Sequence, residues 1–194
     1  MIRSGLRAMA LVVGLGVAGT ALAQDEGPKG KVKVFLKGGV SDYTGDVGDG
    51  IDTGPAWGLT VNVQPLRLLG FELGYEGSRN TVSNDLLPDA TLTRNGATGL
   101  VKIAPPFIDV VKPFVAAGLG ASYISAKGGA GLYDSDLVEE VPVAAGIEFN
   151  TGNLTTGVRA TYRWLVDESF AENTEPGNPQ GGLFDAALTI GGRF

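Results

Sequence analysis

The chain has 194 residues and a formal net charge of −6, with neither cysteine nor histidine. These absences exclude a disulfide framework and remove the commonest general base and the commonest zinc ligand. The acidic balance argues against nucleic acid as a partner, and the 31 glycines lack the regular repeat of collagen.

Residues 1–23 have the parts of a secretory signal peptide. Arg3 and Arg7 form a positive start, an apolar run follows, and the small-residue pattern ALA ends at Ala23. The apolar run is shorter than the ~20 residues of a spanning helix, which disfavours the alternative of a retained membrane anchor. We therefore expect cleavage after Ala23 and a mature barrel domain at 24–194. Loss of the two arginines takes its net charge from −6 to −8.

Eight segments of the mature chain alternate apolar and polar residues with a period of two, which predicts β-strands. They cover residues 31–41, 57–65, 69–78, 94–103, 113–126, 140–150, 154–165 and 184–194. Helix-length runs with 3.6-residue spacing are absent after residue 24, so we predict an all-β fold. At about 9–13 residues the segments exceed the ~5–6 of a common soluble strand and suit the ~9–11 of a strand tilted across a bilayer.

One face of these segments is apolar and the other is charged. The charged residues expected to form an interior (lumen) network are Lys37, Glu72, Glu76, Lys102, Glu148, Arg159 and Arg163. A dry core does not hold so many charges unless they pair, whereas the interior of a membrane barrel is polar. We therefore predict that the apolar face points outward to lipid. The glutamates of the third segment and the arginines of the seventh lie on opposite walls of an eight-stranded ring, within reach of one another.

The connections and the aromatic residues also indicate a membrane barrel. Long connections alternate with shorter ones, as in outer-membrane barrels, whose long loops lie outside. Aromatic residues of the apolar face are expected at the two membrane interfaces. Trp57, Tyr75, Tyr123, Tyr162 and Trp164 are placed near the outer strand ends, and Phe149 and Phe194 near the inner ends.

The last segment, ALTIGGRF, is an apolar alternation that ends in Phe194. With the signal peptide, eight strands and alternating loop lengths, it resembles the small outer-membrane β-barrels of Gram-negative bacteria, the OmpA transmembrane-domain and OmpX-like group. The resemblance covers the mature chain in pattern. It implies an eight-stranded antiparallel up-and-down transmembrane β-barrel in the outer membrane, with extracellular loops, periplasmic termini, and outer-membrane lipid and lipopolysaccharide as partners. It also implies that Leu188, Ile190 and Phe194 form the signal read by the barrel-assembly machinery, with Gly192 as its weak position.

An eight-stranded barrel is just wide enough to be filled by its own side chains, so a large pore is not expected. We predict a structural or surface-interaction protein. One alternative is a small or gated channel for ions and small solutes, because a charge pair across the interior resembles the gate of OmpA-like barrels. Another is a soluble lipocalin-like carrier, which requires the two faces to be reversed.

Neither a cofactor nor a metal is expected. The acidic residues of the first long loop, Asp46 and Asp49 among them, are three apart, whereas a calcium loop of the EF-hand type needs carboxylates at alternate positions.

An outer-membrane enzyme is also disfavoured. Barrels of similar appearance that modify lipid A generally use a catalytic histidine, and the chain has none.

Overall fold

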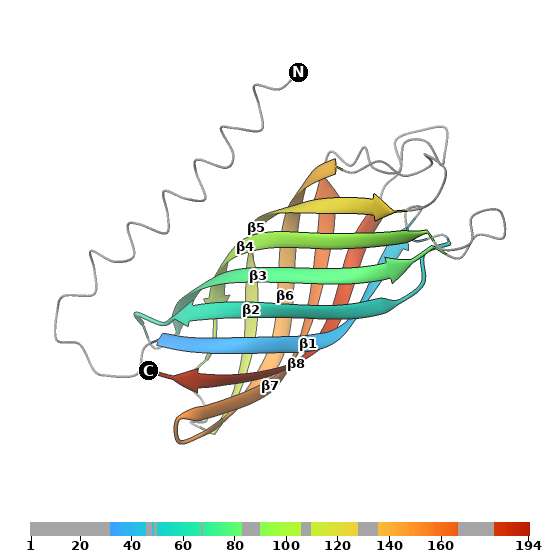
Figure 1. Cartoon of the computed structure of the whole chain (residues 1–194). Helices are drawn as coiled ribbons and strands as arrows, with labels where there is room; N and C mark the ends of the chain where they lie inside the picture. Colours follow the sequence, from blue (N-terminus) through green and yellow to red (C-terminus); the bar gives the residue numbers. More distant parts are fainter. Residues whose placement is uncertain are drawn as a thin grey trace.

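In the computed structural model, eight antiparallel strands close into a barrel (Figure 1). The structure describes residues 32–45, 48, 50–66, 68–82, 90–105, 110–127, 136–166 and 181–194. The strands are β1 (Val32–Gly45), β2 (Gly54–Val63), β3 (Leu69–Thr81), β4 (Thr91–Ile103), β5 (Val111–Lys127), β6 (Asp136–Thr151), β7 (Leu154–Val166) and β8 (Gly181–Arg193). Each strand pairs with its neighbours in sequence, and β8 closes the ring on β1. The predicted all-β, eight-stranded up-and-down barrel is therefore confirmed.

The signal peptide predicted at 1–23 lies outside the described residues, as do Asp46 and Asp49. Within the described part of the chain, no helix is long and apolar enough to cross a membrane. We call the end of the barrel that holds Gly45, Thr81 and Val166 the outer end, and the end that holds Val32 and Arg193 the inner end.

All eight predicted segments fall on strands, but several strands extend further outward than the alternation indicates. β3 continues to Thr81, and β4, which pairs with it, begins at Thr91. Polar residues interrupt the alternation there, while main-chain pairing continues because it does not depend on side-chain polarity. The buried Asn80 shows how a polar residue is accommodated, since its side-chain amide donates to the carbonyls of Ser41 and Asp52 at 2.9 and 3.0 Å.

The register fixes the tilt of the strands. From Val32, the paired residues lead through all eight strands and return to β1 at Asp42, a stagger of ten residues. A stagger of this kind tilts the strands by ~35–45° from the barrel axis. Because the stagger is an even number of residues, each inward-facing residue pairs with inward-facing residues on both neighbouring strands around the whole barrel. The alternation along each strand therefore separates the interior from the outer surface.

The outward face is apolar over most of its height. Leu36, Leu119 and Leu188 are 61%, 70% and 69% exposed. Among the described strands, the charged residues of this face all lie close to the outer strand ends: Asp42, Arg79, Lys127 and Glu139. This is the arrangement predicted for a lipid-facing barrel. It is opposite to that of a soluble lipocalin-like carrier, which requires Trp57 and Tyr75 to line the interior.

A second apolar group lies inside the barrel, next to the outer strand ends. This outer apolar cluster consists of Tyr43, Ile51, Val82, Ala90, Leu92, Ile124, Val138, Leu165 and Leu183, all buried. Its members come from seven of the strands or their ends, so it packs the walls together above the charged residues described below. A smaller buried group, Leu100, Ala116 and Ala144, lies deeper in the barrel.

Candidate functional site

The seven residues of the predicted interior network all lie inside the barrel and all form ion pairs. Their side chains are at most 8% exposed. The structure adds four charged residues to them: Lys33, Arg94, Glu140 and Asp185. These four lie on the charged faces of the same predicted segments, so the alternation alone was sufficient to find them.

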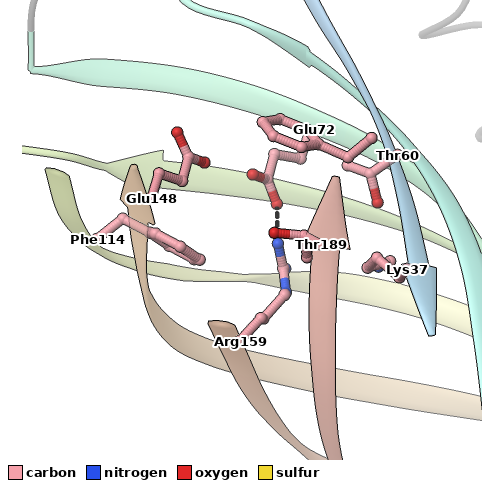
Figure 2. Close-up of a pocket in the computed structure, with 8 residues that line it drawn as sticks. Lys37, Thr60, Glu72, Phe114, Glu148, Arg159 and Thr189 are labelled. Atoms are coloured by element: carbon pink, nitrogen blue, oxygen red, sulfur yellow. Dashed lines mark hydrogen bonds and ion pairs between the residues drawn. The ribbon is translucent and has the colours of Figure 1, made fainter. Parts of the chain in front are cut away.

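Five of the charged residues form an inner network: Lys33, Glu72, Lys102, Glu148 and Arg159. Arg159 of β7 donates through Nη1 to Oε2 of Glu72 on β3 at 2.6 Å (Figure 2). Lys102 Nζ lies 3.0 Å from Glu72 Oε1 and also pairs with Glu148. Lys33 Nζ completes the network, 2.9 Å from Glu148 Oε2. Three cations and two carboxylates leave this network with one excess positive charge.

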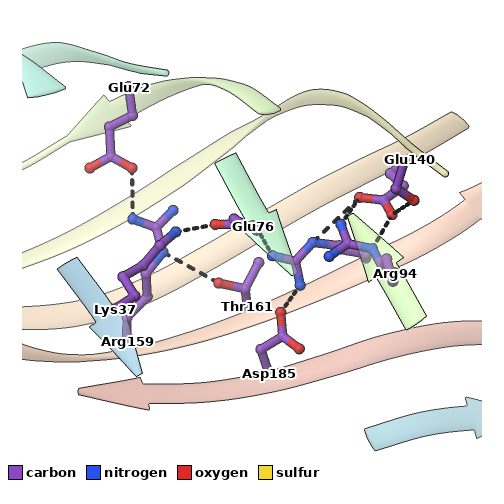
Figure 3. Close-up of polar contacts among 10 residues, drawn as sticks. Lys37, Glu72, Glu76, Arg94, Glu140, Arg159, Thr161 and Asp185 are labelled. Carbon is purple, nitrogen blue, oxygen red and sulfur yellow. Dashed lines mark hydrogen bonds and ion pairs between the residues drawn. The ribbon is translucent and has the colours of Figure 1, made fainter. Parts of the chain in front are cut away.

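The other six form an outer network: Lys37, Glu76, Arg94, Glu140, Arg163 and Asp185 (Figure 3). Arg94 binds Glu140 through two nitrogens, Nε at 2.6 Å and Nη2 at 2.5 Å. Arg163 pairs with Glu76 and Asp185, and its Nε lies 3.5 Å from Glu140. Three cations and three carboxylates make this network neutral.

Glycines on the inward face make room for these pairs. A Cβ on Gly58 would lie 2.9 Å from Lys37 Cε and 3.3 Å from Glu76 Cγ. A Cβ on Gly120 would lie 2.9 Å from Thr98 Cγ2 and 3.6 Å from Glu140 Oε2. The glycine content of the polar faces therefore reflects the space that long charged side chains need in a narrow barrel.

Two inward aromatic rings fill the space around the inner network. The Phe114 ring centroid lies 4.2 Å from Lys102 Nζ and 5.5 Å from Arg159 Cζ, and Lys102 Nζ is 5.8 Å from the Phe35 ring. Cations at these distances are attracted to the ring faces. A small cavity lined by Phe35, Glu72, Phe114 and Arg159 has a volume of about 10 Å³ (Figure 2). That is room for about one water molecule and none for a solute.

The predicted interface aromatics lie on the outward face. Trp57, Tyr123, Tyr162 and Trp164 are in the outer halves of their strands, and Phe149 is near the inner end of β6. Tyr75 is the central residue of β3, because that strand runs to Thr81 rather than ending near residue 78. Two other outward aromatics, Phe71 and Phe184, are 49% and 41% exposed and were not included in the predicted set.

Aromatic rings also cover glycines of neighbouring strands. Trp57 pairs with Gly77 across β2 and β3, and a Cβ on Gly77 would lie 2.6 Å from the indole ring. Tyr162 covers Gly182 in the same manner, and it packs edge-to-face on Trp164 with 5.0 Å between ring centroids. These contacts fix ring positions on an otherwise open surface.

The residues of the predicted assembly signal line the outward face of the last strand. Leu188, Ile190 and Phe194 are 69%, 53% and 76% exposed. The Phe194 main-chain N–H donates to the Val32 carbonyl at 2.9 Å, at the inner end of the seam between β8 and β1. The side chains of this signal are therefore not needed for packing inside the barrel.

An apolar outward face, whose charges in the described strands all lie near the outer strand ends, and an ion-paired interior together define a β-barrel of the outer-membrane type. Residues 9–186 match the family model described as "Outer membrane protein beta-barrel domain", and the chain belongs to this family. The predicted resemblance to small outer-membrane barrels is therefore confirmed. Comparison with the sequences of characterised proteins gave no significant match.

Solved structures of small outer-membrane barrels have the same fold. Neisserial surface protein A (NspA) is 12% identical with a TM-score of 0.62, and the match covers 84% of this chain and 97% of that one. Ail, the attachment invasion locus protein of Yersinia pestis, is 15% identical with a TM-score of 0.57, over 86% and 100% of the two chains. The outer-membrane protein OprG of Pseudomonas aeruginosa is 13% identical with a TM-score of 0.53, over 86% and 97%.

Proposed function

We propose that this protein is an integral outer-membrane barrel with a structural and surface-interaction role. It is exported through a signal peptide cleaved after Ala23, its long loops face the outside of the cell, and its termini lie in the periplasm. The observation that carries the proposal is the combination of an apolar outside with an interior whose eleven network charges are all held in ion pairs. The interior charges bind one another and stabilise the barrel, so contacts with other molecules are expected at its outer surface.

The second candidate function is a gated channel. Arg163 contacts the carboxylates of Glu76, Glu140 and Asp185 together, so it can exchange partners without becoming unpaired. An exchange of this kind would open a path only if the outer apolar cluster also moved. For that reason the structural role is the better-supported proposal.

A catalytic role is not part of the proposal. The chain has no histidine to activate a hydroxyl or a water, and the buried carboxylates are held by arginine and lysine.

Two partners follow from this assignment. The exposed side chains of Leu188, Ile190 and Phe194 are proposed to be recognised by the barrel-assembly machinery during biogenesis. Outer-membrane lipid and lipopolysaccharide surround the finished barrel.

The experiment that tests the proposal is an extraction and mobility assay on outer membranes. The protein should stay in the membrane pellet after a carbonate wash, and on a denaturing gel the unheated sample should migrate differently from the boiled one. A protein released by carbonate, with identical mobility in both samples, would overturn the proposal.

A further inference from the structure

The charges on the outward face are unevenly distributed around the barrel. Among the described strand residues, the outward-facing cations are Arg79 on β3 and Lys127 on β5, on either side of β4, whereas the outward-facing anions are Asp42 on β1 and Glu139 on β6. Arg79 and Lys127 are exposed, and within the described part of the chain neither forms an ion pair.

The register places the two cations close together. Arg79 pairs with Thr93, Thr93 pairs with Ser125, and Lys127 lies two residues further along β5. With strands ~4.8 Å apart and a rise of ~3.3 Å per residue, the Cα atoms of Arg79 and Lys127 are about 12 Å apart. The long side chains can therefore reach neighbouring groups of one ligand.

Polar uncharged side chains lie just inward of the cations. Asn95 pairs with Tyr123 on the neighbouring strand, and the Tyr75 hydroxyl donates to Asn95 Oδ1 at 3.0 Å. We call this group the β3–β5 rim: Arg79, Thr93, Asn95, Tyr123, Ser125 and Lys127. It offers cations, hydroxyls and an amide on one outward surface.

Below the rim the same three strands are apolar. Leu73 pairs with Gly99, and Gly99 pairs with Leu119. From the middle of the barrel outward, the surface therefore changes from aliphatic, through aromatic and amide groups, to hydroxyl and cationic groups. A lipid with acyl chains, a sugar headgroup and phosphates has the same order of chemistry along its length.

We propose that the β3–β5 rim binds the phosphates of a phosphorylated glycolipid of the outer leaflet, with its acyl chains against Leu73 and Leu119. This inference rests on the proposed function, which places the outer end of the barrel at the cell exterior. Charge complementarity identifies the ligand, because among the described residues the cations of the outward face, Arg79 and Lys127, both lie beside β4 at the outer strand ends. Asp42 lies on β1, and Glu139 lies on β6 opposite Ala121, six residues before Lys127.

The test uses the full chain purified from outer membranes in detergent and titrated with fluorescently labelled bis-phosphorylated lipid A. The paired variant Arg79→Gln/Lys127→Gln should raise the apparent dissociation constant by about thirtyfold, or about fivefold for each cation. The matched control is Asp42→Asn/Glu139→Gln, which removes two charges from the same rim of the barrel and should bind as tightly as the wild type or more tightly.

Two further ligands identify the group that is recognised. Dephosphorylated lipid A and phosphatidylglycerol should each bind the wild type at least tenfold more weakly than bis-phosphorylated lipid A. The inference is overturned if the arginine and lysine variant binds as the wild type does, or if either of these ligands binds equally well. Gel mobility of each variant before and after boiling shows whether it is folded. If the paired variant Arg79→Gln/Lys127→Gln is not folded, the single substitutions Arg79→Gln and Lys127→Gln replace it.

The assay also separates this inference from the proposed function. A wild-type protein that is retained in carbonate-washed membranes but does not distinguish the three lipids contradicts the glycolipid site alone. A protein that is released by carbonate contradicts both.

Discussion

Arg159 on β7 and Glu72 on β3 meet across the interior of the barrel, with 2.6 Å between Nη1 and Oε2. Both side chains are almost completely buried, at 5% and 1% exposure. The bond joins two walls that are four strands apart in the ring, so it acts as a strut that main-chain pairing between neighbours does not supply.

Replacing Glu72 with Gln should destabilise the folded barrel by about 3–5 kcal/mol, because Arg159 and Lys102 lose a buried counter-charge that they share. Urea unfolding in lipid vesicles measures the change. Glu139→Gln is the control, since it removes the same charge from an exposed position and should stay within about 0.5 kcal/mol of the wild type. A loss below about 1 kcal/mol for Glu72→Gln would contradict the role of the strut.

Glu76 pairs with both Lys37 and Arg163. In Glu76→Gln, Arg163 keeps Asp185 and Glu140, but the substitution removes the carboxylate that is shared by two cations inside the barrel. Their repulsion should increase the frequency of short conducting events in planar bilayers relative to the wild type, which should be closed almost all the time. Glu139→Gln again serves as the control, with wild-type behaviour. Continuous large conductance of the wild type would show that the interior is not filled by its side chains.

The contact between Trp57 and Gly77 predicts a strong effect of one added methyl group. Gly77→Ala should destabilise the barrel by about 1–3 kcal/mol, because its Cβ would lie 2.6 Å from the indole ring. Adding Trp57→Ala should recover part of this loss in a double-mutant cycle measured by urea unfolding. The matched control is Gly38→Ala, since no atom lies within 4 Å of the added Cβ. Equal effects at the two glycines would rule out the packing explanation.

Substitution of Phe194 distinguishes a role in assembly in the outer membrane from a role in the stability of the folded barrel. Its side chain is 76% exposed, and its main-chain bond to Val32 does not depend on the ring. Phe194→Ala should therefore lower the amount of folded protein in the outer membrane several-fold and leave refolding into vesicles nearly unchanged. Phe184→Ala, another outward aromatic of β8, should leave both measurements near the wild type. A parallel loss in both assays for Phe194→Ala would assign the residue to stability instead.

The faces of the strands were predictable because a period of two is a local property of the sequence. The same alternation that placed Lys37 and Glu72 inside also included Lys33 and Glu140. The bonds themselves were harder to foresee, since Arg94 and Glu140 are 46 residues apart and meet through the register of β4, β5 and β6. Only the position of the third and seventh strands on opposite walls of the ring followed from the number of strands.

The outer parts of the strands were not predictable from alternation. β6 begins at Asp136 and β8 at Gly181, where polar residues and glycines hide the period of two. These strands extend further because their main chains pair with the neighbouring strands. That pairing is a property of the closed ring and not of the local sequence. The position of Tyr75 in the middle of β3 has the same cause.

The outer apolar cluster separates the outer network from whatever medium bathes the outer strand ends. At about 0.1 M, dissolved salt largely screens exposed charges that are more than about 10 Å apart, but mobile ions do not enter a buried apolar layer. The internal struts therefore keep their strength when the salinity of the surroundings changes.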